Sequence, residues 1–459
     1  YNDLNLYVRD FCMENKKELK LFSLAWPIFI ETALFMLLGF IDVFVLSKYD
    51  DLAASAVNTA NQAVSIVTIV FTVISGASAV LISQSLGAGN KKGASRIAAL
   101  SITFSLIFGI IISAILMFFN KPILSFIGAT GQILEFGSQY LSIVGGFLFL
   151  QALLNIMAVI IRNHGMTQIS MYVTVGMNII NTVLDVVFVL GLFGMPRLGV
   201  MGVAIATTFS RFVGTIVLAI VLFKKIEKPS IFKLLKPFPK GDTKNIVKIG
   251  VPSALESFLY NLSQLVITSM VLKFLTDTDL ITKTYVQNIT MFFYIFAVSI
   301  GQASQIIIGH LVGAKKFDDA YKQGFRGYRN CLFITIAVSI IGMLLGKVLM
   351  GVFTDNQEII TLGSNILMMN IFLELGRTTN IILIACLRGA GDVFYPTGCA
   401  IFSMWFISVL GSYVFAVVLG LGIYGLWIAF AADELFRGIM MIIRWKGGKW
   451  RSKRIAVSQ

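Results

Sequence analysis

Apolar runs long enough to cross a bilayer recur along most of this 459-residue chain. A transmembrane helix needs about 20 apolar residues, and the chain contains about twelve such runs, separated by charged residues or by Gly and Pro. Only 13% of its residues are charged, whereas about 25% are charged in an average soluble protein. The sequence therefore predicts an all-α polytopic membrane protein with twelve transmembrane helices and no separate soluble domain.

The distribution of basic residues predicts the orientation of the bundle. The net charge is +14, and the basic residues gather in alternate loops. One side of the membrane receives Lys16, Lys17, Lys20, Lys91, Lys92, Arg96, Arg162, the run from Lys224 to Lys248, Lys315 to Arg329, Arg388 and the tail from Arg444 to Arg454. Basic loops face the cytoplasm, so both termini are expected there. Because topology accounts for the positive charge, we expect no nucleic-acid partner.

The first apolar run, from Leu19 to Leu46, carries Pro27, Glu31 and Asp42. A carboxylate near mid-membrane costs roughly 2.5 to 3.5 kcal/mol, so it persists where it faces protein, water or an ion path. Asp42 is therefore a candidate functional residue. The alternative is that this helix ends earlier and that Asp42 lies at the membrane interface.

The second half of the chain repeats the first. Pro27 and Glu31 recur as Pro252 and Glu256, with the sequence offset 252 − 27 = 225. Leu86-Gly87-Ala88 recurs as Val312-Gly313-Ala314, and Arg162 recurs as Arg388, with the offsets 313 − 87 = 226 and 388 − 162 = 226. Repeats of six spans keep the same orientation, which predicts two pseudo-symmetric six-helix lobes with the substrate path between them. The expected units are an N-lobe over 1–223, a cytoplasmic linker over 224–244, a C-lobe over 245–446 and a basic cytoplasmic tail over 447–459.

These motifs together resemble the multidrug and toxic compound extrusion (MATE) family over essentially the whole chain. The resemblance rests on the Pro and the later Asp of the first helix, the Gly-Ala ends of helices 2 and 8, and three further segments. These segments are Arg388-Gly-Ala-Gly-Asp392, Phe-Leu-Glu374-Leu-Gly-Arg377 and Ala-Asp433-Glu434-Leu-Phe-Arg437-Gly.

The resemblance implies a bacterial secondary transporter of the cytoplasmic membrane and no enzyme activity. It implies that a monomer in contact with membrane lipid exports small organic cations or amphipathic drugs in exchange for protons or sodium ions, without another cofactor.

The same resemblance implies which residues bind the coupling ion. Asp42 matches the acid of the family's N-lobe cation site, Asn181 and Asp185 match the partner pair of the DinF-like branch, and Thr207 matches a ligand on helix 6. Asn181 and Asp185 are four residues apart, so they lie on one helical face. Hard oxygen ligands suit sodium, and Asp42, Asn181 and Asp185 are its candidate ligands. Proton coupling needs a single carboxyl group, and we favour protons slightly.

The C-lobe departs from the NorM branch of the family, because Arg377 stands where that branch has an acid. Glu256, Glu374 and Arg377 are secondary candidates, with Glu31, for transport. The alternative is a buried ion-paired cluster, because an unpaired charge in the membrane is costly.

Met36, Phe40, Met177 and Tyr294 are candidates for lining an adaptable drug cavity, since thioethers and aromatic faces tolerate varied cations. Lipid-facing or core packing is the alternative for each.

A lipid or lipid-linked precursor flippase would share the duplicated architecture. Such a protein would favour a basic cavity, whereas the intramembrane charges here are expected to be mostly acidic. A channel is disfavoured by the lack of a repeated filter loop, and an enzyme by the lack of a catalytic constellation at suitable spacing.

Overall fold

The structure is a computed structural model that describes residues 19–47 and 49–455. Within these ranges every regular element is a helix, which confirms the predicted all-α class. The first group of helices consists of α2 (Leu21–Ser47), α3 (Asp51–Gly87), α4 (Lys91–Phe118), α5 (Asn120–Ile127), α6 (Gly131–Tyr140), η1 (Leu141–Gly145), α7 (Phe149–Asn163), α8 (Thr167–Leu190), η2 (Leu192–Gly194), α9 (Val200–Val221) and η3 (Leu222–Ile226). These form the N-lobe.

A short helix, η4 (Pro229–Leu235), connects the N-lobe to the second group. The second group consists of α10 (Lys240–Phe274), α11 (Asp277–Gly313), α12 (Phe317–Leu344), α13 (Gly346–Gly351), α14 (Gln357–Gly389), α15 (Phe394–Ser403), η5 (Met404–Val409), α16 (Leu410–Ser412), η6 (Tyr413–Val418), α17 (Gly422–Lys446) and η7 (Lys449–Lys453). These form the C-lobe.

Eleven of the twelve expected spans are apolar and long enough to cross a bilayer. Ten of them are single helical stretches, and the eleventh is the stretch from α6 to α7, which bends by 47° between Gly145 and Phe149. The twelfth is α17, 25 residues long, which carries Asp433, Glu434 and Arg437 in its middle. Ion pairs among these three residues allow a charged helix to stand inside the bundle.

Local sequence sets where the long helices begin and kink. The Asp50 carboxylate caps α3 by accepting from the backbone N–H of Leu52 at 2.7 Å. A reciprocal capping box between Thr276 and Asp279 starts α11. Pro27 and the repeated Pro252 both lie inside helices, where each removes a backbone hydrogen bond.

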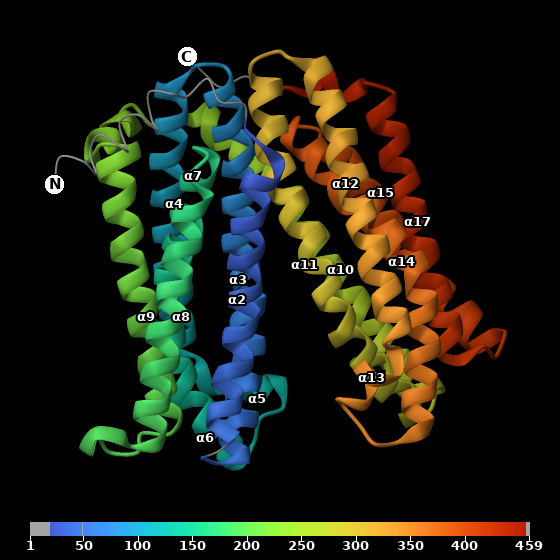
Figure 1. The fold of residues 1–459 in the computed structure, drawn as a ribbon. Coiled ribbons are helices and arrows are strands. Elements are labelled where there is room, and N and C mark those ends of the chain that lie inside the picture. The colour runs from blue at the N-terminus through green and yellow to red at the C-terminus, as the bar shows by residue number, and fades with distance from the viewer. Residues whose placement is uncertain (1–18, 48, 456–459) are drawn as a thin grey trace.

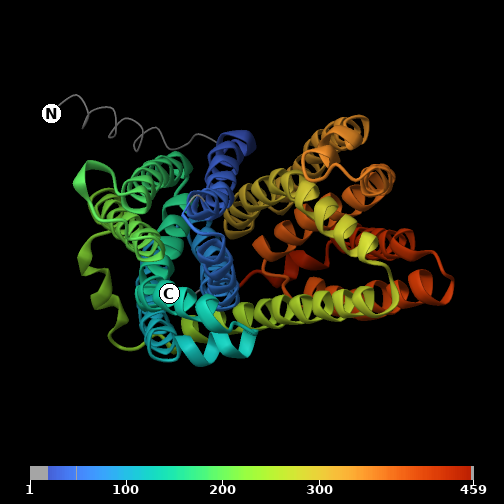
Figure 2. The same cartoon turned by 90° about the horizontal axis from the view of Figure 1, so that it is seen from below.

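The two lobes meet at one end and diverge toward the other (Figure 1). We call the end where α3, α7, α11 and α14 finish the closed end, and the end with α5 and α13 the open end. At the closed end one hydrophobic core joins both lobes, because Leu21 and Ile28 of α2 pack with Ile300 and Ile308 of α11. At the open end each lobe has its own core. Figure 2 shows α10 running from beside the N-lobe into the C-lobe.

The C-terminal segment covers the closed end. Trp450 of η7 is fully buried and stacks on Trp445, with ring centroids 4.2 Å apart. Beyond it, the backbone N–H of Ile455 donates to Gln84 Oε1 of the N-lobe at 3.0 Å. This segment of the C-lobe chain therefore contacts both lobes.

Candidate functional site

The structure brings the four N-lobe candidates together in one buried cluster. Asp42 of α2, Asn181 and Asp185 of α8, and Thr207 of α9 are each at most 4% exposed. In the orientation that satisfies both ends of the Asn181 amide, its Nδ2 lies 3.1 Å from Asp185 Oδ2 and 3.2 Å from Asp42 Oδ1. Its oxygen then accepts from the backbone N–H of Thr207 at 3.2 Å. Asp42 is thus enclosed by protein, and α2 continues past it to Ser47, so the alternative that this helix ends earlier is wrong.

Two residues beside this cluster were not predicted from the sequence. Arg211 of α9, four residues after Thr207, interacts electrostatically with Asp42. Tyr140 of α6 is 1% exposed and donates through its hydroxyl to Asn61 Oδ1 at 3.1 Å. A lone arginine inside an apolar helix is a signal that could have identified Arg211.

Two adjoining cavities lie between the lobes. The first, of about 670 Å³, is lined mainly by α2, α3, α7 and α8, and the second, of about 820 Å³, mainly by α10, α11, α14 and α17. They share Ile69, Glu256, Ser257, Gln302, Gln305 and Arg388. A single chamber with two compartments therefore separates the lobes.

The four residues expected to line a drug cavity differ in their positions relative to the two cavities. Met36 and Met177 line the first cavity and Tyr294 lines the second, whereas the side chain of Phe40 lies outside the described residues. None of the four N-lobe cluster residues, all of them described, is among the residues lining either cavity. Met177 precedes Asn181 by one helical turn on α8, so the cluster lies about one turn beyond the first cavity along this helix.

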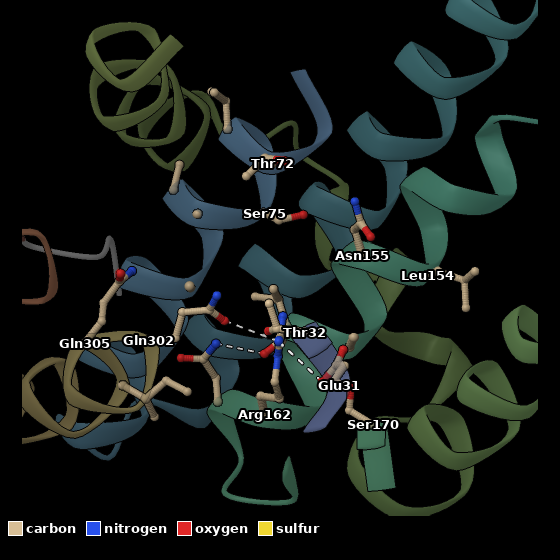
Figure 3. A pocket seen from close by; sticks show the side chains of 18 of the residues that line it. Glu31, Thr32, Thr72, Ser75, Leu154, Asn155, Arg162, Ser170, Gln302 and Gln305 are labelled. Atoms are coloured by element: carbon tan, nitrogen blue, oxygen red, sulfur yellow. Dashed lines mark hydrogen bonds and ion pairs between the residues drawn. The ribbon is translucent and has the colours of Figure 1, made fainter. Parts of the chain in front are cut away.

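Glu31, a secondary candidate, makes polar contacts within the first cavity (Figure 3). Its Oε2 accepts from Arg162 Nη1 at 3.5 Å and from the Ser170 hydroxyl at 2.9 Å. Arg162 Nη1 also donates to Gln302 Oε1 of the C-lobe at 3.3 Å. Glu31 is therefore joined through Arg162 to the other lobe.

Glu256 does not belong to a cluster with Glu374 and Arg377, so that part of the expected ion-paired cluster is wrong. Its Oε2 instead accepts from Arg388 Nη2 at 2.7 Å and from the Thr397 hydroxyl at 2.8 Å. The reason is geometric, because α10 presents Glu256 to the ends of α14 and α15, whereas Glu374 lies near the middle of α14.

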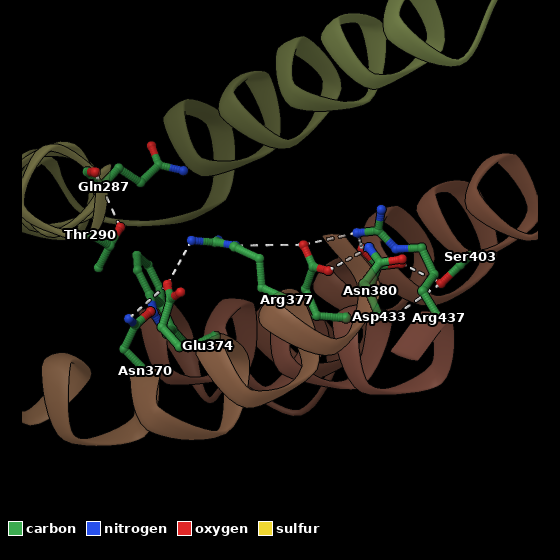
Figure 4. Close-up of polar contacts among 11 residues, drawn as sticks. Gln287, Thr290, Asn370, Glu374, Arg377, Asn380, Ser403, Asp433 and Arg437 are labelled. Atoms are coloured by element: carbon green, nitrogen blue, oxygen red, sulfur yellow. Dashed lines mark hydrogen bonds and ion pairs between the residues drawn. The ribbon is translucent and has the colours of Figure 1, made fainter. Parts of the chain in front are cut away.

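Glu374 and Arg377 do form a buried ion-paired network, together with residues of α17 (Figure 4). Arg377 Nη1 donates to Glu374 Oε1 at 2.7 Å, and its Nε lies 3.7 Å from Glu434 Oε1. Arg437 continues the network to Glu434 at 3.1 Å and to Asp433 at 2.7 Å. Three acids and two arginines therefore alternate across the two helices, so that each arginine lies between two carboxylates.

The lining of the chamber is more basic than the expectation of mostly acidic intramembrane charges implies. The two cavities together are lined by three glutamates and four arginines, namely Glu31, Glu256, Glu434, Arg162, Arg377, Arg388 and Arg437. The sequence predicts Arg162 and Arg388 in basic cytoplasmic loops and Arg377 in a cluster with Glu256 and Glu374, and it assigns no partner to Arg437.

A pseudo-symmetric set of contacts, which we call the clasp, joins the lobes at the closed end. Gln84 Nε2 of α3 donates to the Gly389 carbonyl of α14 at 2.8 Å, and His310 Nε2 of α11 lies 2.9 Å from the Asn163 carbonyl of α7. Gln84 and His310 are related by the repeat offset (310 − 84 = 226), as are Asn163 and Gly389 (389 − 163 = 226). The offset alone could have revealed this equivalence, but it was not predicted.

Glycines allow α3 and α11 to touch at the clasp. A methyl group on Gly87 would overlap the carbonyl oxygen of His310, and one on Gly313 would overlap the carbonyl oxygen of Gln84. The Gly-Ala motif that ends helices 2 and 8 therefore has a structural reason, because a side chain at either position would hold the lobes apart.

Comparison with known proteins identifies similar chains over nearly the full length. The MatE family model matches residues 27–187 and 252–414, which are the two repeats. The uncharacterized transporter YisQ of Bacillus subtilis is 39% identical and 96% of each chain is covered. A probable multidrug resistance protein NorM of Thermotoga maritima is 28% identical, with 96% of this chain and 94% of that one covered.

A solved structure shares the fold. It is described as an outward-facing conformation of a multidrug resistance MATE family transporter of the MOP superfamily, and it superposes with a TM-score of 0.85 at 21% identity. The match covers 94% of this chain and 96% of that one. The two-lobe arrangement of twelve helices is consistent with this fold.

Proposed function

The chain belongs to the MatE family of membrane transporters, and from this premise we propose that it is a multidrug efflux antiporter. In this proposal it exports amphipathic compounds and organic cations across the bacterial cytoplasmic membrane in exchange for a proton or a sodium ion. The names of multidrug resistance relatives support export of drugs. The observation that carries ion coupling is the buried cluster of Asp42, Asn181 and Asp185 in the N-lobe.

The cluster can exchange occupants because charge is costly in a dry site. Two carboxyl groups that share one amide repel each other when both are ionised, so the site gains from taking up a proton or a metal cation. Entry of one cation disfavours another. This competition is the minimal physical basis for exchange between ion and cargo.

The amide of Asn181 suits either coupling ion. With its N–H groups toward both carboxylates it stabilises the acids between proton transfers. With Nδ2 toward the Thr207 hydroxyl at 3.3 Å, it turns its oxygen to them, which is the hard ligand that a sodium ion prefers. We favour a proton slightly, because one carboxyl group suffices to carry it.

We assign the closed end to the cytoplasm, because Lys91, Lys92, Lys315 and Lys316 follow the helices that finish there. The chamber then opens outward in this conformation, and alternating access requires the clasp to part. A proton moving with the membrane potential supplies about 2.3 kcal/mol per 100 mV. The entry of one or two ions for each exported molecule is therefore sufficient to drive substantial drug export.

The proposal is tested by drug efflux from proteoliposomes under an imposed proton or sodium gradient. Wild-type protein should export a fluorescent amphipathic dye when a proton gradient is imposed, and Asp42→Asn should lose this dependence. Glu256 lies in the chamber rather than in the cluster, so Glu256→Gln should keep the dependence on the proton gradient even where it alters the rate of dye export. If Asp42→Asn exports dye at the original rate under a proton gradient, the assignment of coupling to Asp42 is wrong.

Lipid transport is a second candidate function, and the four arginines that line the chamber favour it. Arginine binds phosphate through paired hydrogen bonds. A labelled anionic phospholipid in the same proteoliposomes distinguishes the two. Lipid crossing without dye export under either gradient would replace the efflux proposal with a flippase.

A further inference from the structure

The two repeats place the same three-residue contact in both lobes. Glu31, Arg162 and Ser170 form one triad, and Glu256, Arg388 and Thr397 form the other. Equivalent members are related by nearly the same sequence offset (256 − 31 = 225, 388 − 162 = 226 and 397 − 170 = 227). In each triad the glutamate accepts from one arginine nitrogen, at 3.5 Å and 2.7 Å, and from one hydroxyl, at 2.9 Å and 2.8 Å.

Both triads face the space between the lobes. Glu31, Arg162 and Ser170 line the first cavity, and Glu256 and Arg388 line both cavities. Gln302 of α11 also lines both and accepts from Arg162 at 3.3 Å. A ligand in the chamber would therefore meet one triad from each lobe.

The arginines retain donors for a ligand. A guanidinium has five N–H groups, and each of these two contacts its glutamate through a single nitrogen. Their side chains are 14% and 28% exposed, so they remain accessible from the chamber. A purely structural ion pair would be expected to be sealed by protein.

The unused guanidinium donors favour an acidic group over a cation. Each triad is electrically neutral, because one arginine stands against one glutamate, so the two triads offer an organic monocation no net negative charge. A carboxylate or phosphate binds guanidinium groups through paired, charge-assisted hydrogen bonds. The glutamates can meanwhile accept an ammonium group of the same ligand.

We propose that the paired triads form a site for the acidic group of an amphipathic substrate, so that zwitterions bind better than cations of the same shape. The inference rests on the proposed efflux function and names the substrate chemistry that the chamber selects.

The site lies directly beside the clasp. Arg162 precedes Asn163, whose carbonyl contacts His310, and Arg388 precedes Gly389, whose carbonyl accepts from Gln84. Opening of the closed end would separate the triads, one to each lobe. A ligand that engages both arginines therefore stabilises the conformation described here.

The test is equilibrium binding to the purified full chain, measured by fluorescence polarisation. The probes are a rhodamine with a free benzoate, which is a zwitterion, and its methyl ester, which is a cation of nearly the same shape. Wild type should bind the zwitterion more tightly than the ester. Arg162→Gln and Arg388→Gln should each weaken zwitterion binding about tenfold, the loss expected for one charge-assisted hydrogen bond. Neither variant should weaken binding of the ester, because each leaves the charge of one glutamate free to attract a cation.

Two further variants control for effects of misfolding. Arg326→Gln removes an exposed arginine of α12 and should leave both affinities unchanged. The double variant Glu31→Gln with Arg162→Gln removes both charges of one triad, so no unpaired buried charge remains, and should again lower only zwitterion binding. The inference is overturned if the double variant has the same ratio of the two affinities as wild type.

Efflux in proteoliposomes separates this inference from the proposed function. If wild type exports neither dye under any gradient but shows the arginine-dependent preference, efflux is wrong and the site stands. If it exports both dyes without that preference, only the site is wrong. A competing anionic phospholipid that displaces the zwitterion from wild type, and less from Arg162→Gln, identifies a lipid headgroup as a further source of the acidic group.

Discussion

The clasp makes a sharp prediction about the glycines that end α3 and α11. An added Cβ on Gly87 would lie 2.6 Å from the carbonyl carbon of His310, and one on Gly313 would lie 2.8 Å from that of Gln84. Carbon atoms pack at about 3.5 to 4.0 Å. Gly87→Ala or Gly313→Ala should therefore force the two helices apart by roughly 1 Å.

This displacement has a large effect on the equilibrium between conformations. Overpacking costs about 1 to 3 kcal/mol, and the two cross-lobe hydrogen bonds contribute about 1 kcal/mol each. A total of about 3 to 5 kcal/mol shifts the equilibrium by at least a hundredfold, because about 1.4 kcal/mol corresponds to a factor of ten. The alanine variants should favour a conformation whose closed end is parted.

Spin labels at the open end provide the assay. Phe126, at 94% exposure on α5, and Val352, at 76% just after α13, are suitable labelling sites on the two lobes. Pulsed electron spin resonance should give the long distance in wild type and a shorter distance in the alanine variants. Gly76→Ala is the matched control, because its Cβ would meet no atom within 4 Å. An unchanged distance distribution in both clasp variants would refute the reasoning.

Three further outcomes are expected. Asp42→Asn and Glu31→Gln should change the open-end distance non-additively, since both residues lie on α2, and additive effects would show that they act independently. Arg377→Gln should lower the free energy of unfolding by about 3 to 5 kcal/mol, because Glu374 is left buried and unpaired. The double variant with Glu374→Gln should recover most of this loss when melting temperatures are measured by thermal denaturation. Equal melting temperatures of the single and double variants would contradict this. Burial raises the pKa of Glu227, which follows η3, and the hydrogen bond from the Ser95 hydroxyl opposes this rise. The folded state therefore holds the proton of Glu227 more tightly than the unfolded state does. Stability falls as the pH rises above the pKa of about 4.3 in the unfolded state. Glu227→Gln should therefore stabilise the protein more at neutral than at acidic pH, and an equal gain at both would contradict the effect.

The sequence predicted the fold well because the bilayer imposes a simple rule on each span. Length and apolarity identify most of the helices, and the repeat of Pro27 as Pro252 relates the lobes. Short helices such as α5 and α13 were missed, since they are too short for a span and depend on packing at the open end. Interior charges of α17 also show that pairing in the fold overrides apolarity.

A site residue could be predicted when its own type and place were sufficient, but not when its role depends on which residue it contacts. An acid in an apolar helix is by itself sufficient to identify Asp42. The partner of Glu256 is Arg388 rather than Arg377, and this depends on how α10 crosses the C-lobe, which no local pattern encodes. The clasp was likewise hidden, because glutamine and histidine near helix ends carry no intrinsic signal until their carbonyl partners are known.

The ion site and the clasp are connected through two helices. Asp42 and Glu31 lie eleven residues apart on α2, about 16 Å along the helix, and both contact residues of α8 or α7. The contact of Glu31 with Arg162, at 3.5 Å, is longer than that of Glu256 with Arg388, at 2.7 Å, so it is the looser link.

A change of charge at Asp42 alters the attraction between α2 and α8, and a rigid helix passes that displacement to Glu31. Arg162 then moves with the Asn163 carbonyl that contacts His310. The contact between the Asn163 carbonyl and His310 should therefore break before the contact between Gln84 and the Gly389 carbonyl. Any non-additivity between Asp42→Asn and Glu31→Gln measures this coupling directly.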